Sequence, residues 1–439
     1  MLSAFRNAVV IPDLRAKLLV TIGILAVYRL MSFIPTPGID ISRLRAVGFG
    51  QGDIFTLLNF VSGGNFEVFS IAALGVIPYI TASIIMQLLQ STYEPLQKLA
   101  REGEEGRKRI SQITRFSALG LAAVQAVFLA TTLLGNSGAL KVGWSNGPFF
   151  WLIVLITQVA GVALVMWLGE KITEFGIGNG ISLIIYAGIV AAFPGAITQQ
   201  FALIGQGESN LFGLISFFAL LIVAITGMVM VQQAERRIPV QYARKVVGRK
   251  VMGGQTTYIP LRVNSAGVIP IIFAVSILIL PATLIGAFPD ILWLQTVGNW
   301  FNSARWEGLF TSTLLIIGFT YFYTQVSFDP RRISENLREY GGFVPGVRPG
   351  QPTTDHLTRI AGRITLWGAL FLGVVNALPQ VLAWITGAGQ FSFVFSGTSL
   401  LIMVGVSLDT LRQLESQLMM RHYEGFVSKG RIRGRGRRF

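Results

Sequence analysis

Ten long apolar runs are the feature that most constrains what this chain can fold into. In lipid, the backbone satisfies its hydrogen bonds only as a helix or as a closed barrel. Runs of this length match helices that cross a hydrocarbon core about 30 Å thick. We therefore expect ten transmembrane helices, over residues 18–34, 71–90, 116–134, 149–168, 181–196, 211–231, 266–285, 310–328, 364–382 and 393–411.

The composition supports a membrane location. Charged residues make up 13% of the chain and hydrophobic residues 52%, whereas about a quarter of the residues of a soluble domain are charged. The first apolar run is too long for a cleaved signal peptide and has no small-residue cleavage site. We interpret this run as an uncleaved first span.

The basic residues predict how the chain is oriented. Lys and Arg are retained on the cytosolic side of a membrane, and 31 of the 36 in this chain fall in the two termini and in alternate loops on one side. The even number of spans agrees with this split. We expect both termini in the cytosol, and the net charge of +15 predicts anionic partners for the exposed loops.

The spans divide into five and five, which predicts two halves that face opposite ways in the membrane, as in inverted-repeat transport proteins. The second span contains Gly-Val-Ile-Pro at 75–78, and the seventh, its counterpart, contains the same tetrapeptide at 267–270. A short match has little weight in a chain so rich in these residues. Gly and Pro also loosen the backbone hydrogen bonds of a helix, which favours walls that move or line a cavity.

Several kinds of chemistry are excluded or disfavoured. The chain has no cysteine, which excludes disulfides, thiol nucleophiles and Cys-based metal sites. The spans hold almost no ionisable groups apart from Arg29 and Asp409, and the uncharged Gln87, Asn264 and Asn376 have interhelical hydrogen bonding as their simplest role. No phosphate-binding loop or HExxH spacing occurs. We expect no cofactor, no metal and no catalytic residue.

Three segments outside the spans carry further predictions. Residues 54–61 are apolar but too short to cross a bilayer, and Ser62, Gly63 and Gly64 follow them; this piece is either an interfacial helix or a stopper for a cavity. The basic loops 232–265 and 329–363 favour a docking platform, the first with a hairpin-like pattern and the second with Arg348 at a turn. The basic tail 429–438 has the composition of a disordered segment.

Ordered blocks of sequence give the chain a resemblance to a known family. They are SFIPTPGID at 32–40, ALGVIPYI at 73–80, WLGE at 167–170, GIGNGI at 176–181, VNSAGVIP at 263–270 and FVPGVRPG at 343–350. With these blocks the chain resembles the SecY/Sec61 α family, the central subunits of protein translocons. The match runs nearly from end to end.

The resemblance implies an all-α membrane protein with ten transmembrane helices in two inverted five-helix halves around a central hourglass pore. The halves would be residues 1–200, with a plug near 54–66, and 201–411, with 412–439 as a basic cytosolic tail. The pore would be constricted by an aliphatic ring of Val76, Ile80, Ile185, Ile272 and Ile402. The plug would consist of Leu58, Asn59, Phe60, Val61, Ser62, Gly63, Gly64 and Asn65.

The family's lateral gate would lie between spans 2 and 7, with spans 3 and 8, and its polar positions match Gln87 and Asn264. Such a gate implies that polar segments pass through the pore while apolar segments leave sideways into lipid. Two positions depart from the family pattern. Val76 stands where Ile is commoner, and Lys250 stands where a second Arg is familiar.

Family membership implies partners that composition does not reveal. These are the SecE and SecG subunits, the motor ATPase SecA, the ribosome, secretory and membrane-protein nascent chains, and anionic phospholipids. ATP hydrolysis is expected only from a partner, and the location would be the bacterial inner membrane. The residues that bind partners would be Arg244, Lys245, Arg249, Lys250 and Arg348.

Two other classes of function need residues that the predicted spans lack. A small-solute secondary transporter shares broken helices and an inverted repeat, but needs a polar or charged site at midplane, where this chain is apolar. An intramembrane protease needs a Ser/His, paired Asp or HExxH constellation within its spans, and none occurs. Both are disfavoured.

Overall fold

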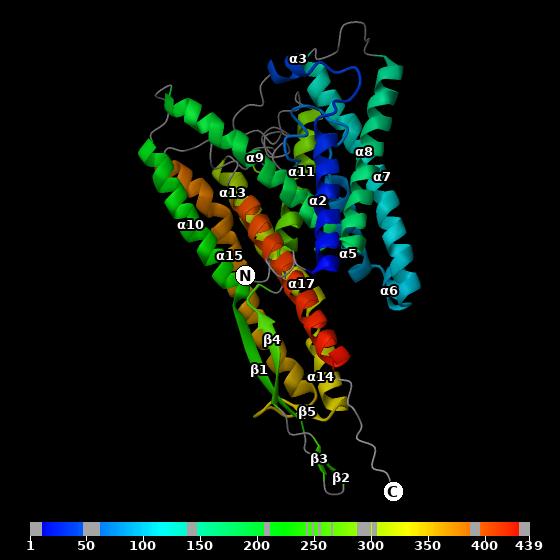
Figure 1. Ribbon diagram of the computed structural model, residues 1–439, viewed down its shortest axis with the longest axis vertical. Helices are drawn as coiled ribbons and strands as arrows, with labels where there is room; N and C mark the ends of the chain where they lie inside the picture. The colour runs from blue at the N-terminus through cyan, green and yellow to red at the C-terminus, as the bar shows by residue number, and fades with distance from the viewer. Residues whose placement is uncertain are drawn as a thin grey trace.

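The computed structural model describes residues 11–46, 62–137, 147–205, 211–242, 245–247, 250–252, 256–264, 267–287, 300, 305–386 and 396–429. Most of these residues are helical (Figure 1). The helices are α2 (Pro12–Ser32), α3 (Ile41–Ala46), α5 (Ile77–Thr92), α6 (Glu94–Arg101), α7 (Glu104–Ser137), α8 (Pro148–Phe175), α9 (Gly180–Gly205), α10 (Leu211–Gln233), α11 (Ile269–Ala287), α13 (Trp306–Ser327), α14 (Pro330–Glu339), α15 (Gln351–Thr386) and α17 (Gly397–Lys429).

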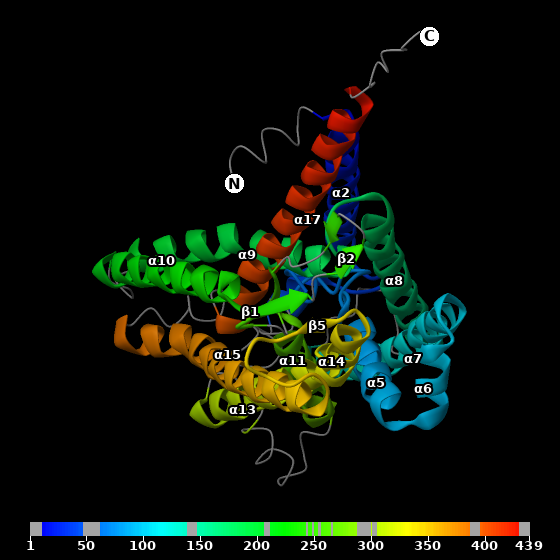
Figure 2. The same cartoon turned by 90° about the horizontal axis from the view of Figure 1, so that it is seen from below.

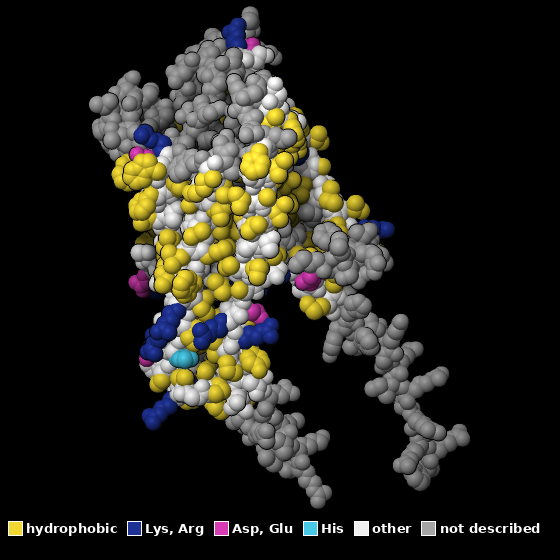
Figure 3. Space-filling view, turned by 90° about the vertical axis from the view of Figure 1, so that its left-hand side faces the viewer, with side chains coloured by type: hydrophobic (Ala, Val, Ile, Leu, Met, Phe, Trp, Pro, Cys, Tyr) yellow, Lys and Arg dark blue, Asp and Glu magenta, His cyan; other side chains and the backbone are white. Residues whose placement is uncertain are grey.

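Each of the ten sequence-predicted spans falls on one of these helices, in the order α2, α5, α7, α8, α9, α10, α11, α13, α15 and α17. Within the described residues, five helical stretches are by themselves long and apolar enough to cross a membrane, and two shorter apolar helices cover Gly180–Gly195 and Ile269–Leu278. Hydrophobic side chains cover the middle of the face seen in Figure 3, and Lys and Arg side chains gather beyond one end of this apolar region. The chain is a multi-pass helical membrane protein.

Two boundaries differ from the sequence prediction. The second span was expected from residue 71, but residues 71–76 form buried turns and α5 begins only at Ile77. The last helix continues to Lys429, where a tail was expected from residue 412. Its extension is helical because Leu414 and Leu418 pack against Leu14 and Ile177, which supplies a small apolar core.

The repeated Gly-Val-Ile-Pro begins a helix at both of its positions rather than loosening one from within. Gly75 and Gly267 have φ values of +52° and +65°, a left-handed conformation that glycine adopts without strain. The proline follows in the first turn of α5 and of α11, where its missing N–H costs no helical hydrogen bond. The expectation that this Gly and Pro loosen the hydrogen bonds within the two helices is therefore wrong, and the two helix starts share one local geometry.

The helices enclose a common apolar core. Viewed from below, α5, α7 and α8 lie on one side and α10, α13 and α15 on the other, with α11 between them (Figure 2). The largest buried cluster contains side chains of both groups of helices. It also includes Tyr28 of α2 and Leu408 of α17. A second cluster fills the space among α5, α7 and α8, and Val275 is its member from α11.

A small structured domain projects from one end of the helices (Figure 1). Strand β1 (Glu235–Tyr242) pairs antiparallel with β4 (Thr256–Arg262) and with β5 (Gly342–Phe343), and β2 (Lys245–Val247) pairs with β3 (Lys250–Met252). This confirms the hairpin expected in the first basic loop. A separate apolar core beneath the sheet joins the two basic loops, with Ile238, Val240, Leu261, Leu337, Val344 and Leu357.

Candidate functional site

The five residues of the predicted aliphatic ring come from four helices and meet at the centre of the molecule. Val76 caps the start of α5 and Ile80 lies one turn later; Ile185, Ile272 and Ile402 lie on α9, α11 and α17. All five belong to or pack against the largest apolar cluster, and Ile272 is the one that is only half buried. The structure therefore brings together residues that are up to 326 positions apart, from Val76 to Ile402.

A narrow cavity of about 20 Å³, here called the ring pocket, is lined by Ile80, Ile185, Ile272 and Ile402. Its other lining residues were not singled out from the sequence: Ile77, Ile189, Val275, Ser276, Thr398 and Ser399. Each lies three or four positions from a ring residue. Because such neighbours share one face of a helix, helical spacing from the ring residues was the signal that would have found them.

A second small cavity, of about 10 Å³, lies next to the ring on the side of the plug and is called the plug-side pocket. Val76, Ile80 and Ile185 line it together with Tyr28 and Ser62. Ser62, a predicted plug residue, thus lines the same cavity as three predicted ring residues. Of the remaining predicted plug residues, Gly63, Gly64 and Asn65 are described, whereas Leu58, Asn59, Phe60 and Val61 lie outside the described residues.

The described end of the predicted plug, residues 62–65, is bonded to α2. The Tyr28 hydroxyl donates to the Ser62 carbonyl oxygen at 3.2 Å and accepts from Nδ2 of Asn65 at 3.1 Å. Nη1 of Arg29 donates to the Gly63 carbonyl oxygen at 2.7 Å. Ser62 and Asn65 are buried. The sequence identified Arg29 as an unusual charge in a span without indicating this contact.

A cavity of about 290 Å³ with polar and apolar lining, the vestibule, opens on the other side of the ring. Ile272 lines both the vestibule and the ring pocket. Polar side chains form much of its wall, including Asn264, Asp409 and Arg412. Arg412 donates to the Gln232 carbonyl oxygen at 3.1 Å and lies 3.6 Å from the Asp409 carboxylate. The vestibule therefore has polar groups in its wall and ends at the apolar ring pocket.

The two predicted gate residues are not bonded to each other in the described part of the chain. Asn264 is buried; its Nδ2 donates to the Gly267 carbonyl oxygen at 3.0 Å, and its Oδ1 has no partner among the described atoms. Gln87 is half buried on α5. The helices do meet as expected, since α11 contacts α5, α7 and α13. Fully buried alanines of α7, Ala118, Ala122 and Ala126, allow close packing beside this seam.

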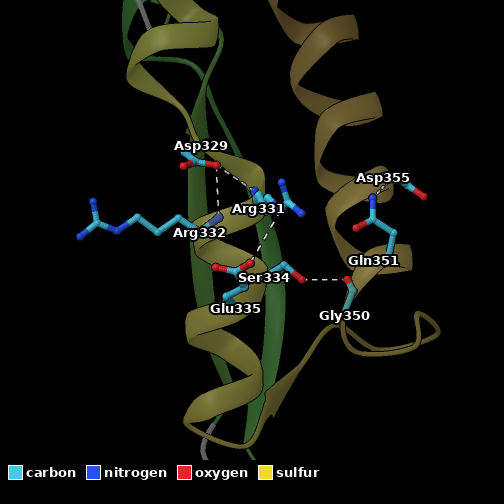
Figure 4. Close-up of polar contacts among 8 residues, drawn as sticks. All are labelled: Asp329, Arg331, Arg332, Ser334, Glu335, Gly350, Gln351 and Asp355. Atoms are coloured by element: carbon cyan, nitrogen blue, oxygen red, sulfur yellow. Dashed lines mark hydrogen bonds and ion pairs between the residues drawn. The ribbon is translucent and has the colours of Figure 1, made fainter. Parts of the chain in front are cut away.

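Arg348 is exposed on a well-braced turn in the basic-loop domain. Its carbonyl oxygen accepts from Thr353 Oγ1 at 2.8 Å, and Ser334 Oγ donates to the Gly350 carbonyl oxygen at 2.8 Å (Figure 4). Asp329 caps α14 by accepting from the backbone N–H groups of Arg331 and Arg332. Side chains of α14 and α15 thus brace the turn that presents Arg348.

Two of the other predicted docking residues lie in the β2–β3 hairpin. Lys245 begins β2 and Lys250 begins β3, with Val247 opposite Lys250 in the pairing. Arg244 and Arg249 lie outside the described residues. Within the described residues, no group of three or more His, Asp or Glu side chains is arranged to hold a metal ion.

Comparison with known proteins places this geometry in a family. The family model described as SecY matches residues 70–411. A protein translocase subunit SecY from Thermus thermophilus is 57% identical over 440 residues, covering all of both chains. A second subunit of that name, from Thermotoga maritima, is 44% identical and covers 99% of this chain and 100% of its own.

Solved structures share the fold. The structure described as that of a protein conducting channel aligns with a TM-score of 0.62 at 17% identity over 95% of both chains. A SecY structure, described as showing that the plug domain stabilises the closed state of that channel, aligns with a TM-score of 0.60 at 18% identity, again over 95% of both chains. Sec61 from a canine ribosome–channel complex aligns with a TM-score of 0.58 at 16% identity over the same share.

Proposed function

The chain belongs to the SecY family, and from this premise we propose that it is the protein-conducting channel of a protein translocase, with the ring as its constriction. The observation that carries the proposal is the ring itself. Five aliphatic residues from four helices meet between a vestibule of about 290 Å³ and the buried plug end. A channel for a chain of any sequence needs such a seal, because an apolar constriction resists wetting by ions.

The ring suits polypeptide better than a small solute. Branched aliphatic side chains make no directional bonds, so they adapt to successive side chains of a passing segment. A transporter site at this depth needs polar or charged groups that recognise one solute; the ring pocket instead offers aliphatic side chains with hydroxyls from Ser276, Thr398 and Ser399. We assign no catalytic residue and no cofactor to the chain, and energy for transport comes from a partner.

The seam between α11 and the pair α5–α7 is the proposed lateral gate. When it parts, a segment in the pore samples lipid, and sufficiently apolar segments leave sideways. Asn264 and Gln87 lie on the two sides of this seam. The buried Oδ1 of Asn264 has no partner among the described atoms. A buried amide oxygen is stabilised by accepting a hydrogen bond. We propose that a polar group donates to this oxygen when the gate rearranges.

The basic-loop domain is the proposed docking surface, with Arg244, Lys245, Arg249, Lys250 and Arg348 as its contacts. One solved neighbour is a ribosome–channel complex, which supports the ribosome as a partner; the motor SecA is the alternative user of the same surface. SecE and SecG are the proposed companion subunits. Anionic phospholipids are proposed to bind the remaining basic residues on this side.

The proposed location is the bacterial inner membrane, with the basic-loop domain and both termini in the cytosol and the plug on the opposite side. The distribution of Lys and Arg supports this orientation. Residues 1–200 and 201–411 are the proposed halves of the channel, and α5 and α11, which start with the same geometry, are counterparts in them. Residues 412–439 form the proposed cytosolic end of the chain.

A transport assay tests the function. Vesicles that contain the chain with its companion subunits and motor are given an unfolded preprotein or, separately, a panel of small solutes. The proposal predicts protease-protected preprotein, dependent on the motor's ATP, and no concentrative uptake of any solute. Uptake of a solute without protection of the preprotein would overturn it in favour of a secondary transporter.

A further inference from the structure

We infer that Tyr28 and Arg29 of α2 form a latch that holds plug residues 62–65 shut against the ring. The inference deepens the proposed function and rests on it, because it assumes that the ring is the conducting path. Two neighbouring side chains on one helix make three hydrogen bonds to one short segment, at 2.7, 3.1 and 3.2 Å. That segment faces the plug-side pocket through Ser62.

The Arg29 contact is the stronger part of the latch. A charged guanidinium within a span is costly unless it has a partner, and in the described residues Arg29 has no Asp or Glu as a partner. Its guanidinium instead donates to the Gly63 carbonyl oxygen and lies 5.8 Å from the centre of the Phe33 ring. Hydrogen bonds from charged donors are shorter and stronger than neutral ones. The Gly63 carbonyl is thus the partner that accounts for this charge.

The opposite side of the plug end is held by α9. Gly63 has a φ of +74°, and a Cβ atom placed on it would lie 2.6 Å from the Cα atom of Gly188. Two glycines therefore allow the plug backbone to touch the α9 backbone directly. The latch on α2 and this close contact on α9 clamp the segment between them.

The chain beyond the plug is anchored separately, which limits what the latch must control. The backbone N–H groups of Thr36 and Ile71 donate to the carbonyl oxygens of Phe69 and Ile34, both at 2.9 Å. Nε2 of Gln158 on α8 donates to the Ser70 carbonyl oxygen at 3.0 Å. Residues 69–71 are thus fixed to α8 and to the segment after α2. Asn65 is bonded to this anchored stretch, through its carbonyl oxygen to the Ser70 N–H at 2.9 Å and through Nδ2 to the Ala72 carbonyl oxygen at 3.3 Å. Release of Tyr28 and Arg29 therefore frees residues 62–64 without detaching α5.

The latch has a consequence for substrate selection. A substrate opens the channel only if its binding free energy exceeds the cost of breaking the closed contacts. Removing latch bonds lowers this cost. The latch residues are therefore positioning residues that set how strong an opening signal must be.

A labelling experiment tests the latch without any transport. The chain has no cysteine, so Ser62→Cys introduces a single thiol. The substitution keeps the bond from Tyr28, because Tyr28 donates to the backbone carbonyl of residue 62 and not to its side chain. The labelling rate of this thiol by a membrane-impermeant maleimide, added from the plug side to vesicles of the assembled complex, reports the fraction of open plug. Adding Arg29→Gln is expected to raise the rate about tenfold, or about 1.4 kcal/mol, and Tyr28→Phe by about threefold.

The matched control is Arg305→Gln, which removes an arginine on the same side of the chain that pairs with Glu307 at 3.5 Å. It is expected to leave the labelling rate unchanged. The latch is wrong if Arg29→Gln and Arg305→Gln label alike while both complexes assemble in normal amounts. Should Arg29→Gln fail to assemble, Tyr28→Phe, which deletes one oxygen atom, carries the test alone.

A transport arm separates this inference from the proposed function. Failure of the wild-type complex to protect any preprotein contradicts the channel itself. The latch alone is contradicted by a different result. In that case the wild-type complex transports preprotein, but Arg29→Gln transports a preprotein with a weakened signal no better than wild type does. The expected result is several-fold better transport of the weakened preprotein by Arg29→Gln, with the normal preprotein little changed.

Discussion

The two sides of the ring are built in opposite ways. Toward the basic-loop domain, the vestibule of about 290 Å³ has walls of polar and apolar side chains; toward the predicted plug, the pocket of about 10 Å³ is bordered by Tyr28, which donates to the Ser62 carbonyl oxygen. In the proposed channel, the wide side receives the polypeptide and the tightly packed side resists leakage. We therefore propose that closure depends on the plug side and reception on the vestibule side.

The largest effect is expected where the plug touches α9. Gly63→Ala places a methyl group 2.6 Å from the Gly188 Cα atom and keeps a φ of +74°, so left-handed strain of about 1–2 kcal/mol adds to an overpacking cost of about 1–3 kcal/mol. We expect a strong rise in ion leakage of reconstituted vesicles. Gly64→Ala is the matched control, because its φ is +85° but the space around its Cβ is open. Equal leakage from both variants would mean that the close contact is irrelevant to closure.

The next effect is expected at the ring. Ile402→Asn puts an amide into the apolar ring pocket, where burial without a partner costs about 1–3 kcal/mol, and the site responds by taking up water. Conductance measured in planar bilayers should rise, while Ile402→Val, at about 1 kcal/mol in stability, should leave the channel closed. A tight Ile402→Asn channel would show that closure depends on the plug alone.

A smaller effect is expected on the exposed Arg348 turn. Arg348→Ala removes a charge that contributes nothing to the domain's core, so thermal unfolding should be unchanged. Binding of the ribosome or motor, measured by cosedimentation, should weaken by about three- to tenfold and more at low salt than at high salt. Arg338→Ala on α14 is the comparison, and equal loss from both would indicate diffuse attraction to charge instead of a specific contact.

The smallest effect is expected in the vestibule. Arg412→Gln weakens the bond to the Gln232 carbonyl oxygen and the pair with the Asp409 carboxylate, which is 63% exposed. Because such screened pairs contribute less than about 1 kcal/mol, stability should change little and vesicles should stay tight. Leakage from this variant would break the comparison, since it would assign closure to both sides of the ring.

The sequence predicted the helices better than it predicted the turns between them. Apolar runs identify spans because lipid leaves few alternatives, and all ten predicted spans fall on helices. Residues 71–76 are equally apolar yet form turns, since Gly75 adopts a positive φ and Pro78 lies in the first turn of α5. Hydropathy alone does not distinguish a buried turn from a buried helix.

The ring residues were named by family resemblance, and the structure brings them together. Periodicity alone indicates only that such residues are buried. The bonds from Tyr28 and Arg29 to residues 62–65 span 34 to 37 positions, and no spacing rule links such partners. The continuation of α17 to Lys429 was missed because it depends on contacts with Leu14 and Ile177, from two distant parts of the chain.

The most direct test of the central claim is crosslinking within the ring. The chain has no cysteine, so Ile272→Cys or Ile402→Cys introduces a single thiol, and a secretory chain with one cysteine is stalled in the assembled complex. We expect disulfide formation at either position and none at Ile222→Cys, a control on α10 that is 64% exposed. A verified stalled chain that crosslinks at neither ring position would contradict the account, because polypeptide would then not pass through the centre of this subunit.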